Sequence, residues 1–82
     1  MANRKKPHEG NQVVLMGLPS GFLKGLPVED QRAITAMIGQ PVTLAGFDED
    51  GRAELEFADP FDGPNSSHTI WVAPEFISPI QI

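Results

Sequence analysis

The 82-residue sequence contains no cysteine, no tyrosine and no hydrophobic run long enough to cross a bilayer. Without cysteine, there are no disulfides to reinforce a small core, no thiolate metal site and no thiol nucleophile. A reducing, cytoplasmic setting is the natural expectation. The first residues also lack the apolar stretch of a signal peptide, and a membrane span needs about 20 apolar residues. Neither export by that route nor membrane insertion is expected.

Basic residues are scarce beyond the first ten positions. Residues 1–10 carry three bases and one acid, a formal charge of +2, whereas residues 11–82 carry three bases and ten acids, a formal charge of −7. Binding of nucleic acid depends on clustered Lys and Arg that neutralise phosphates. Nucleic acid is therefore not the expected ligand of the acidic body, and a basic protein partner fits it better.

The length of the chain suits one domain with a modest core. Eight Gly, eight Pro and 40% hydrophobic residues favour a globular protein with many turns and short strands. Residues 1–11 are polar and aperiodic, which predicts a disordered basic tail, and residues 12–82 are predicted to form the single domain. The Arg4-Lys5-Lys6 cluster in the tail could contact acidic surfaces or nucleic acid. Such clusters more often only solubilise a chain, so the tail is assigned no site.

A strand, a loop and a helix are predicted in the first half of the domain. Gln12–Met16 is apolar and β-branched and ends at a glycine, which indicates a strand. Gly17–Pro27 alternates Gly and Pro with large apolar residues, as in a loop that folds back over a core. Val28–Ile38 is predicted to be a helix, because a proline precedes it, two acids lie in its first turn and Gly39 follows it. The expected anchors of the loop are Leu18, Phe22, Leu23 and Leu26.

A β-hairpin is the strongest local prediction. Pro41–Phe47 and Arg52–Ala58 have the composition of strands, and Asp48-Glu49-Asp50-Gly51 joins them with an Asp-Gly pair that is typical of hairpin turns. Apolar and charged residues alternate in the second of these strands, as in a sheet with one face on the core and one in water. Glu54 and Glu56 are therefore expected to face water.

The last third of the chain is predicted to hold two more strands. Asp59–Ser67 concentrates turn-favouring residues and is expected to be an irregular loop that cannot pair as a strand. His68–Ala73 is expected to form the fourth strand and Pro74–Phe76 a short turn. Ile77–Ile80 is expected to be an edge strand, where Pro79 is tolerated.

The order of these elements resembles that of SH3-like β-barrels. From Gln12 to Ile80, the sequence predicts five short strands, a long folded loop after the first, a hairpin, and a single turn before the last. The resemblance is carried most by Val42–Phe57 and by Trp71–Ile80, which is similar to the proline-containing turn that leads into the last SH3 strand. The fold it implies is mainly β with one helix: a small barrel of about five strands, with the helix inserted after the first strand. Small bacterial SH3-like proteins accept such insertions.

The chain departs from signalling SH3 domains in two respects. A helix stands where those domains have an irregular loop, and the Ala-Leu-Tyr-Asp-Tyr motif of proline-binding SH3 domains is absent. Because recognition of PxxP peptides depends on stacked aromatics, that ligand is not expected. Some small bacterial SH3-like proteins are acidic antirepressors that occupy the DNA-binding face of a transcription factor, and the charge of this chain is compatible with that role.

Residues that could carry chemistry form no recognised constellation. Asp48–Gly51 is acidic but lacks the spaced ligands and distal Glu of a calcium loop. His8 and His68 lack metal-ligand spacing. Ser66 and Ser67 adjoin His68, but adjacency in a loop supplies neither an opposed base nor an oxyanion pocket. The sequence predicts no catalytic residue, no metal and no cofactor.

Trp71 is the most informative residue, because it falls on the strand face opposite its apolar neighbours. One interpretation is that the helix or the Gly17–Pro27 loop packs across it, which is the commoner situation for a large aromatic. The other is that Trp71 and Phe76 form a partner-binding patch rimmed by Glu75, Glu54 and Glu56.

The function predicted from the sequence is a non-catalytic protein-interaction module with an acidic or aromatic binding surface. One alternative is a structural subunit or accessory domain of a bacterial enzyme complex. Another is an acidic antirepressor or an immunity-type inhibitor. A nucleic-acid binder that uses the basic tail is a further class, which deletion of residues 1–10 would test.

Overall fold

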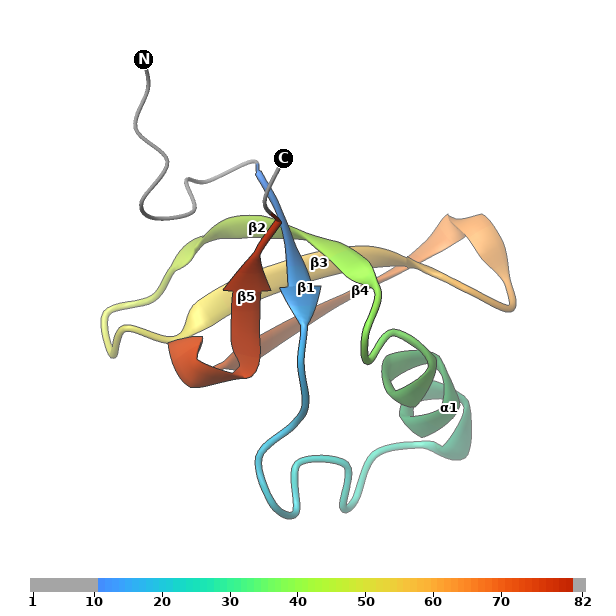
Figure 1. The fold of residues 1–82 in the computed structure, drawn as a ribbon. Coiled ribbons are helices and arrows are strands. Elements are labelled where there is room, and N and C mark those ends of the chain that lie inside the picture. Colours follow the sequence, from blue (N-terminus) through green and yellow to red (C-terminus); the bar gives the residue numbers. More distant parts are fainter. Residues whose placement is uncertain (1–10, 81–82) are drawn as a thin grey trace.

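The structure is a computed structural model that describes residues 11–80, which form one antiparallel sheet of five strands and a single α-helix (Figure 1). The elements are β1 (Gln12–Leu15), α1 (Val28–Ala36), β2 (Pro41–Phe47), β3 (Ala53–Asp59), β4 (Gly63–Val72), the 3-10 helix η1 (Pro74–Phe76) and β5 (Ile77–Pro79). The strand order is β4-β3-β2-β1-β5. The predicted mainly-β fold with one helix is confirmed, but the sheet is not closed, because β4 and β5 form two separate edges. Of the predicted tail, only Asn11 lies within the described residues.

The alternation predicted for the third strand is confirmed. Ala53, Leu55 and Phe57 are buried, whereas Glu54 is half-buried and Glu56 is exposed. Each fully buried apolar side chain of this kind stabilises a fold by about 1.5–3 kcal/mol. The core draws on all strands but β5, together with α1, and consists of Val13, Leu15, Ala33, Ile34, Val42, Leu44, Ala53, Leu55, Phe57, Ile70 and Val72.

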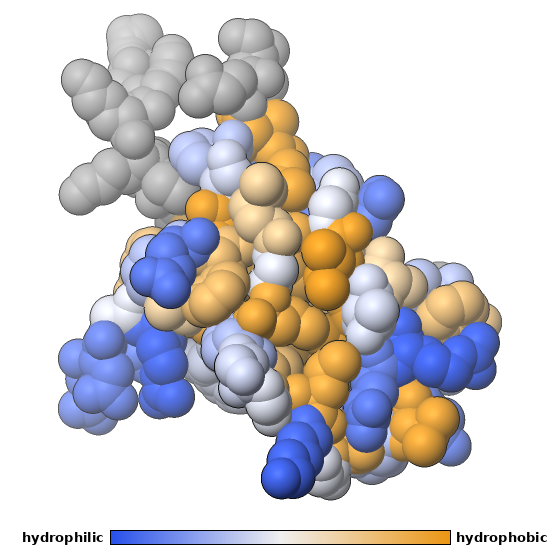
Figure 2. All heavy atoms as spheres, turned by 60° about the horizontal axis from the view of Figure 1, so that its bottom comes forward, coloured by the Kyte–Doolittle hydropathy of each residue, from blue (hydrophilic) through white to orange (hydrophobic). Residues whose placement is uncertain are grey.

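The loop after β1 and helix α1 lie on the same side of the sheet (Figure 1). All four predicted loop anchors are half-buried and pack against the core, as does Met37. Figure 2, which looks onto this side, shows hydrophobic residues gathered over its middle and hydrophilic residues around them. The helix ends at Ala36 and not at the predicted Ile38, because the N–H groups of Met37 and Ile38 donate to carbonyls three residues back and tighten the last turn.

The predicted hairpin between β2 and β3 is confirmed. The N–H of Gly51 donates to the carbonyl of Asp48 at 2.9 Å, and Gly51 has φ +82°. Asp48 Oδ1 accepts from the backbone N–H groups of Asp50 and Arg52, and Asp48 Oδ2 pairs with the Arg52 guanidinium at 2.7 Å. Burial raises the pKa of Asp48, but these hydrogen bonds and the Arg52 charge outweigh it and hold the pKa below its ordinary value. The acidic turn between β2 and β3 is therefore stabilised by hydrogen bonds and an ion pair among its own residues.

Strand β2 changes partners along its length. Pro41 and Val42 pair with β1, Thr43 pairs with both neighbours, and the following residues pair with β3. A bulge after Leu44 shifts the register, so that Phe47 comes opposite Ala53. The sheet therefore diverges where β2 begins and β3 ends.

The prediction that Asp59–Ser67 is an irregular loop unable to pair is wrong. Strand β4 begins at Gly63, and Ser67 pairs with Ala58 of β3. The carboxylate of Asp59 accepts hydrogen bonds from the N–H groups of Phe61 and Asp62, at 2.8 and 2.9 Å, and closes a tight turn. Gly63, with φ +87°, then returns the chain to the sheet.

The C-terminal prediction is confirmed in outline. Strand β5 is an edge strand of three residues, and Pro79 lies in it opposite Val13. The turn before it is the 3-10 helix η1, whose Phe76 carbonyl accepts from the N–H of Met16 at 2.7 Å. The end of β1 is thereby tied to the chain just before β5.

Candidate functional site

The ten-residue strand β4 pairs with β3 on one side only. Within residues 11–80, no backbone hydrogen bond joins its other side to any segment. In an antiparallel strand, alternate N–H and C=O groups point to each side, so this edge presents a row of unpaired donors and acceptors. The strand contains no Asp, Glu, Lys or Arg.

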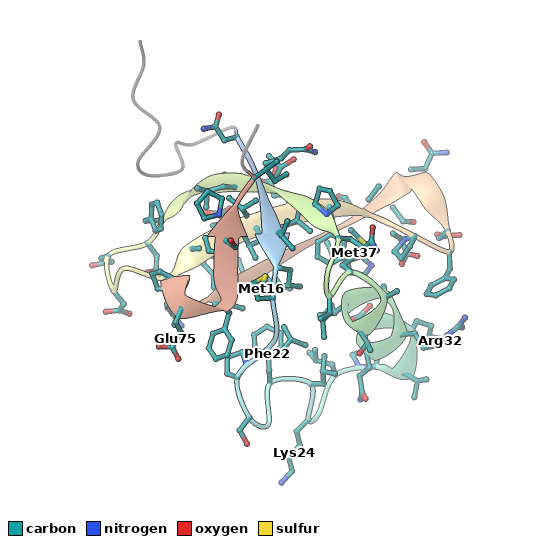
Figure 3. All side chains as sticks on the ribbon, in the orientation of Figure 1. Met16, Phe22, Lys24, Arg32, Met37 and Glu75 are labelled. Atoms are coloured by element: carbon teal, nitrogen blue, oxygen red, sulfur yellow. The ribbon has the colours of Figure 1, made fainter. Side chains whose placement is uncertain are left out.

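A cleft of about 350 Å³ runs along this edge, and we call it the edge cleft. It contacts four consecutive residues of β4, and since successive strand residues point to opposite faces, a cavity that reaches all four lies along the strand edge. In Figure 3, Phe22 points from the loop toward the sheet and Lys24 points away. The residues that line the edge cleft are Phe22, Leu26, Asp30, Ile34, Arg52, His68, Thr69, Ile70 and Trp71.

His68, which lines the edge cleft, lies between two carboxylates. Its Nε2 is 2.8 Å from Asp59 Oδ2, and its Nδ1 is 4.0 Å from Asp30 Oδ1. The ring stacks on Phe57, with 5.4 Å between the centroids. The hydrogen bond to His68, followed by those from the Phe61 and Asp62 amides, lowers the pKa of Asp59 below its ordinary value. Asp59 is therefore an anion at neutral pH, and its charge is engaged by His68.

A second contact ties α1 to the turn between β3 and β4. The guanidinium of Arg32 lies over the ring of Phe61, 4.4 Å from its centroid, in a cation–π arrangement. Together with the approach of Asp30 to His68, this contact holds the helix opposite β4. The edge cleft thus has walls from three separate parts of the chain.

The structure brings together some of the predicted partner-binding residues and separates others. Trp71 is 43% exposed and lies opposite Glu54 in the β3–β4 register. Exposed Glu56 lies two residues after Glu54 in β3 and therefore on the same face of the sheet. Phe76 is half-buried and packs against the core. Glu75 is exposed on η1 and points away from the sheet (Figure 3). Glu54, Glu56 and Trp71 therefore form one surface, which we call the outer face, whereas Phe76 is a core contact.

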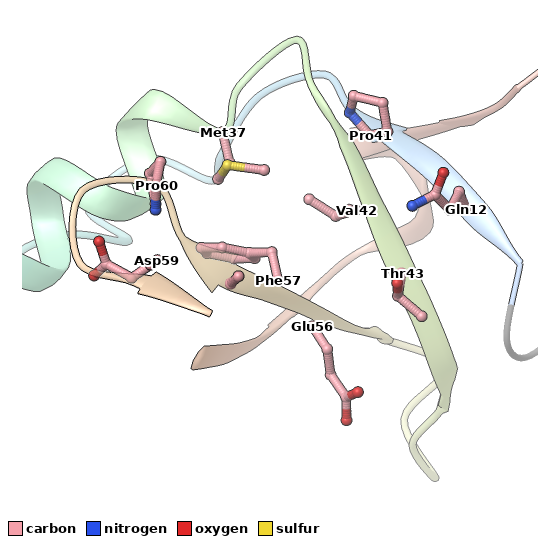
Figure 4. Close-up of a pocket in the computed structure, with 11 residues that line it drawn as sticks. Gln12, Met37, Pro41, Val42, Thr43, Glu56, Phe57, Asp59 and Pro60 are labelled. Carbon is pink, nitrogen blue, oxygen red and sulfur yellow. The ribbon is translucent and has the colours of Figure 1, made fainter. Parts of the chain in front are cut away.

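A second hollow, of about 440 Å³, lies where β2 diverges from β3 (Figure 4). Val42, Phe57 and Met37 line it together with Pro41 and other residues of the two strands. In Figure 4, the carboxylate of Glu56 points away from Val42 and Met37. The hollow thus reflects the divergence of the strands and offers no convergent set of polar groups.

The polar groups near β4 form structural contacts. Both ring nitrogens of His68 face carboxylates, and the Ser66 hydroxyl donates to Asp62 and not to His68. A nucleophile activated by histidine requires a hydrogen bond between the two. Among residues 11–80, no three His, Cys, Asp or Glu side chains lie close enough to hold a metal ion.

Sequence reasoning missed the roles of Asp30, Asp59 and His68, and it treated Phe22 and Leu26 only as core anchors. These residues come from segments about forty positions apart, and only the strand order shows that they meet. One local signal was available. Asp followed by Pro-Phe-Asp-Gly after a strand is typical of an Asx-type turn, which predicts a capped turn that continues into another strand.

Comparison with models of protein families, with curated proteins and with solved structures gives no match. Within the described residues, no helix has the length and apolar character needed to cross a membrane.

Proposed function

We propose that this chain is a non-catalytic protein-interaction module that binds a basic surface of a protein partner through the outer face. The observation that carries the proposal is Trp71, which is 43% exposed and paired in register with Glu54. Tryptophan is among the residues that dominate interface energetics when a partner covers them. The formal charge of −7 over residues 11–82 favours a basic partner, because complementary charge accelerates association.

An SH3-like fold in the cytoplasm is part of the same proposal. The long loop after β1, the β2–β3 hairpin and the single turn η1 before β5 support the resemblance. The absence of cysteine is compatible with a reducing compartment. The basis for proposing binding over catalysis is that the polar side chains nearest to His68 and in the hairpin turn are engaged with one another: Asp48 with Arg52, Asp59 with His68, and Ser66 with Asp62.

Affinity capture with quantitative mass spectrometry tests this function. The test variant is Glu54→Lys with Glu56→Lys, and the matched control is Glu29→Lys with Glu49→Lys, which changes the charge equally at two exposed positions of α1 and the hairpin tip. We expect a saturable partner that the wild type and the control recover and that the test variant loses by about fivefold or more.

Two outcomes contradict the proposed function: no saturable partner, or equal recovery by the two double variants. The identity of a partner also separates the alternatives. Co-purification in fixed stoichiometry with an enzyme indicates a structural subunit, whereas a basic transcription regulator or nuclease indicates an antirepressor or an immunity-type inhibitor.

A further inference from the structure

We propose that the free edge of β4 accepts an extended segment of a protein partner as an additional strand, with an apolar side chain of that segment in the edge cleft and a basic side chain against Asp30. This inference rests on the proposed protein-binding function and assigns it a mode of recognition and a class of ligand.

The first step of the argument concerns the backbone of β4. Natural sheets protect exposed edges with short strands, prolines, charged side chains or a covering segment. Strand β5 has two of these devices, since it is three residues long and contains Pro79. Strand β4 is ten residues long. It contains Pro64 near its start, but residues 65–72 have no proline and no Asp, Glu, Lys or Arg, and in the described structure the outer side of the strand pairs with nothing. Strand addition satisfies such an edge with main-chain hydrogen bonds.

The second step concerns the apolar lining of the edge cleft. Phe22, Leu26 and Ile34 line it together with Ile70 and Trp71 of β4. Its volume of about 350 Å³ is at the lower end of ligand sites, which span about 300–1,000 Å³. In strand addition, alternate side chains of the incoming segment occupy such pockets while its backbone pairs with the edge. A cleft directly beside an unpaired strand meets both requirements.

The third step concerns charge. Of the cleft's three charged or titratable groups, Arg52 is paired with Asp48 at 2.7 Å and with Asp50 at 3.5 Å, and His68 is paired with Asp59 at 2.8 Å. The Asp30 side chain is 40% exposed and lies 4.0 Å from His68 Nδ1, but none of the hydrogen bonds among residues 11–80 engages it. Its carboxylate is therefore the least engaged charge of the cleft, and it favours a basic side chain in a ligand.

A second copy of this chain does not meet these requirements with its own edge. Pairing of β4 with β4 would bring two strands without Lys or Arg together and would leave Asp30 without a cationic partner. The occupant that matches the charge of Asp30 is thus a basic, extended segment of a protein partner.

The test uses the peptide acetyl-Lys-Thr-Val-Lys-Val-Thr-Val-Lys-amide and the fluorescence of Trp71, the single tryptophan of the chain. We expect a saturable change with the wild-type protein. Two N-methylated isomers of the peptide are then compared. One carries the N-methyl groups on its odd-numbered residues and the other on its even-numbered residues, so that each isomer has one of its two hydrogen-bonding edges blocked. One isomer should bind about tenfold or more weakly, because it loses its hydrogen bonds to β4, and the other should bind like the parent.

A matched pair of protein variants tests the charge. Asp30→Asn should weaken peptide binding about threefold, whereas Glu29→Gln, at the neighbouring exposed position of α1, should leave it unchanged. A peptide with Glu in place of Lys should bind less tightly to the wild type than the parent does.

Three results would overturn the inference: no saturable change up to about 1 mM peptide, equal binding of both N-methylated isomers, or equal effects of the two variants. Sedimentation that shows a dimer dissociated by Thr69→Lys would assign the edge to a second copy instead.

The outcomes also separate the two proposals. If the peptide does not bind while affinity capture depends on Glu54 and Glu56, strand addition at β4 is wrong and the proposed function stands. If the peptide binds while capture finds no partner, the outer-face function is wrong and the edge remains.

Discussion

Strands β5 and β4 form the two edges of the same sheet, and they differ in length and in how much of the edge a proline protects. The β5 edge is three residues long and contains Pro79, which has no N–H to offer. The β4 edge is ten residues long, has Pro64 only near its start, and lies beside the edge cleft over residues 68–71. The short β5 edge is thus protected by its proline, whereas Pro64 protects only the start of β4, and the edge cleft lies along the unprotected residues 68–71.

The two edges also differ in how they are anchored. Ile70 of β4 is 5% exposed and belongs to the core, whereas Ile77 of β5 is half-buried at its margin. A strand that is anchored through its core side and open along its backbone can accept another strand without first unfolding. The predictions below test this difference.

The largest effect is expected for Ile70→Ala. It should lower the free energy of unfolding by about 2–5 kcal/mol, because it leaves a cavity beneath β4. Ile77→Ala should cost about half as much or less, since solvent already reaches that side chain. Urea unfolding of both variants measures the difference, and equal losses would show that β4 and β5 are anchored alike.

Gly51→Val should lower the free energy of unfolding by about 1–3 kcal/mol, because a β-branched residue is strained at the φ of +82° that closes the β2–β3 hairpin. This hairpin joins the half of the sheet that holds β4 to the half that holds β5. Urea unfolding measures the loss. Thr69→Val, at an exposed position of β4, is the control for a valine side chain on the surface where the backbone tolerates β-branching, and it should cost less than about 0.5 kcal/mol.

Acid should weaken the β4 side of the sheet through Asp59. Its pKa is lowered in the folded state, first by the hydrogen bond to His68, so that the unfolded chain binds more protons as the pH falls past the ordinary carboxyl range. The stabilisation is therefore complete above the unfolded pKa and is lost as the pH drops through the lower folded value. Urea unfolding at about pH 5 and pH 3 should show a smaller acid loss for Asp59→Asn than for the wild type, and equal losses would contradict this account.

The smallest effect on stability is expected for the double variant Glu54→Lys with Glu56→Lys. Both side chains lie on the outer face, so the free energy of unfolding should change by less than about 1 kcal/mol. Association with a captured basic partner should nevertheless slow, and the rate should depend less on salt. A normal fold with an unchanged rate and salt response would remove the outer face as the interface.

Much of the fold follows from local sequence patterns. Alternation in β3 predicts which residues face the core, Asp50-Gly51 predicts the hairpin, and the loop anchors are recognisable as large apolar residues between breakers. The start of β4 was mispredicted because Gly, Pro, Asn and Ser disfavour strands locally, while pairing with β3 and the turn capped by Asp59 override that preference.

The candidate site is less predictable than the fold. The outward direction of Glu54, Glu56 and Trp71 follows from the two-residue period of a strand. The edge cleft does not, because it joins the segment from Phe22 to Ile34 with β4, and their proximity depends on which strand lies at the edge. No local pattern in the sequence specifies that order.

Hydrogen exchange of the two edges, with and without the lysine-containing peptide at saturation, tests the central claim most directly. The account predicts that amides of residues 68–72 in β4 exchange more slowly with the peptide, while those of residues 77–78 in β5 keep their rates. Unchanged exchange in β4, or protection confined to β5, would contradict it.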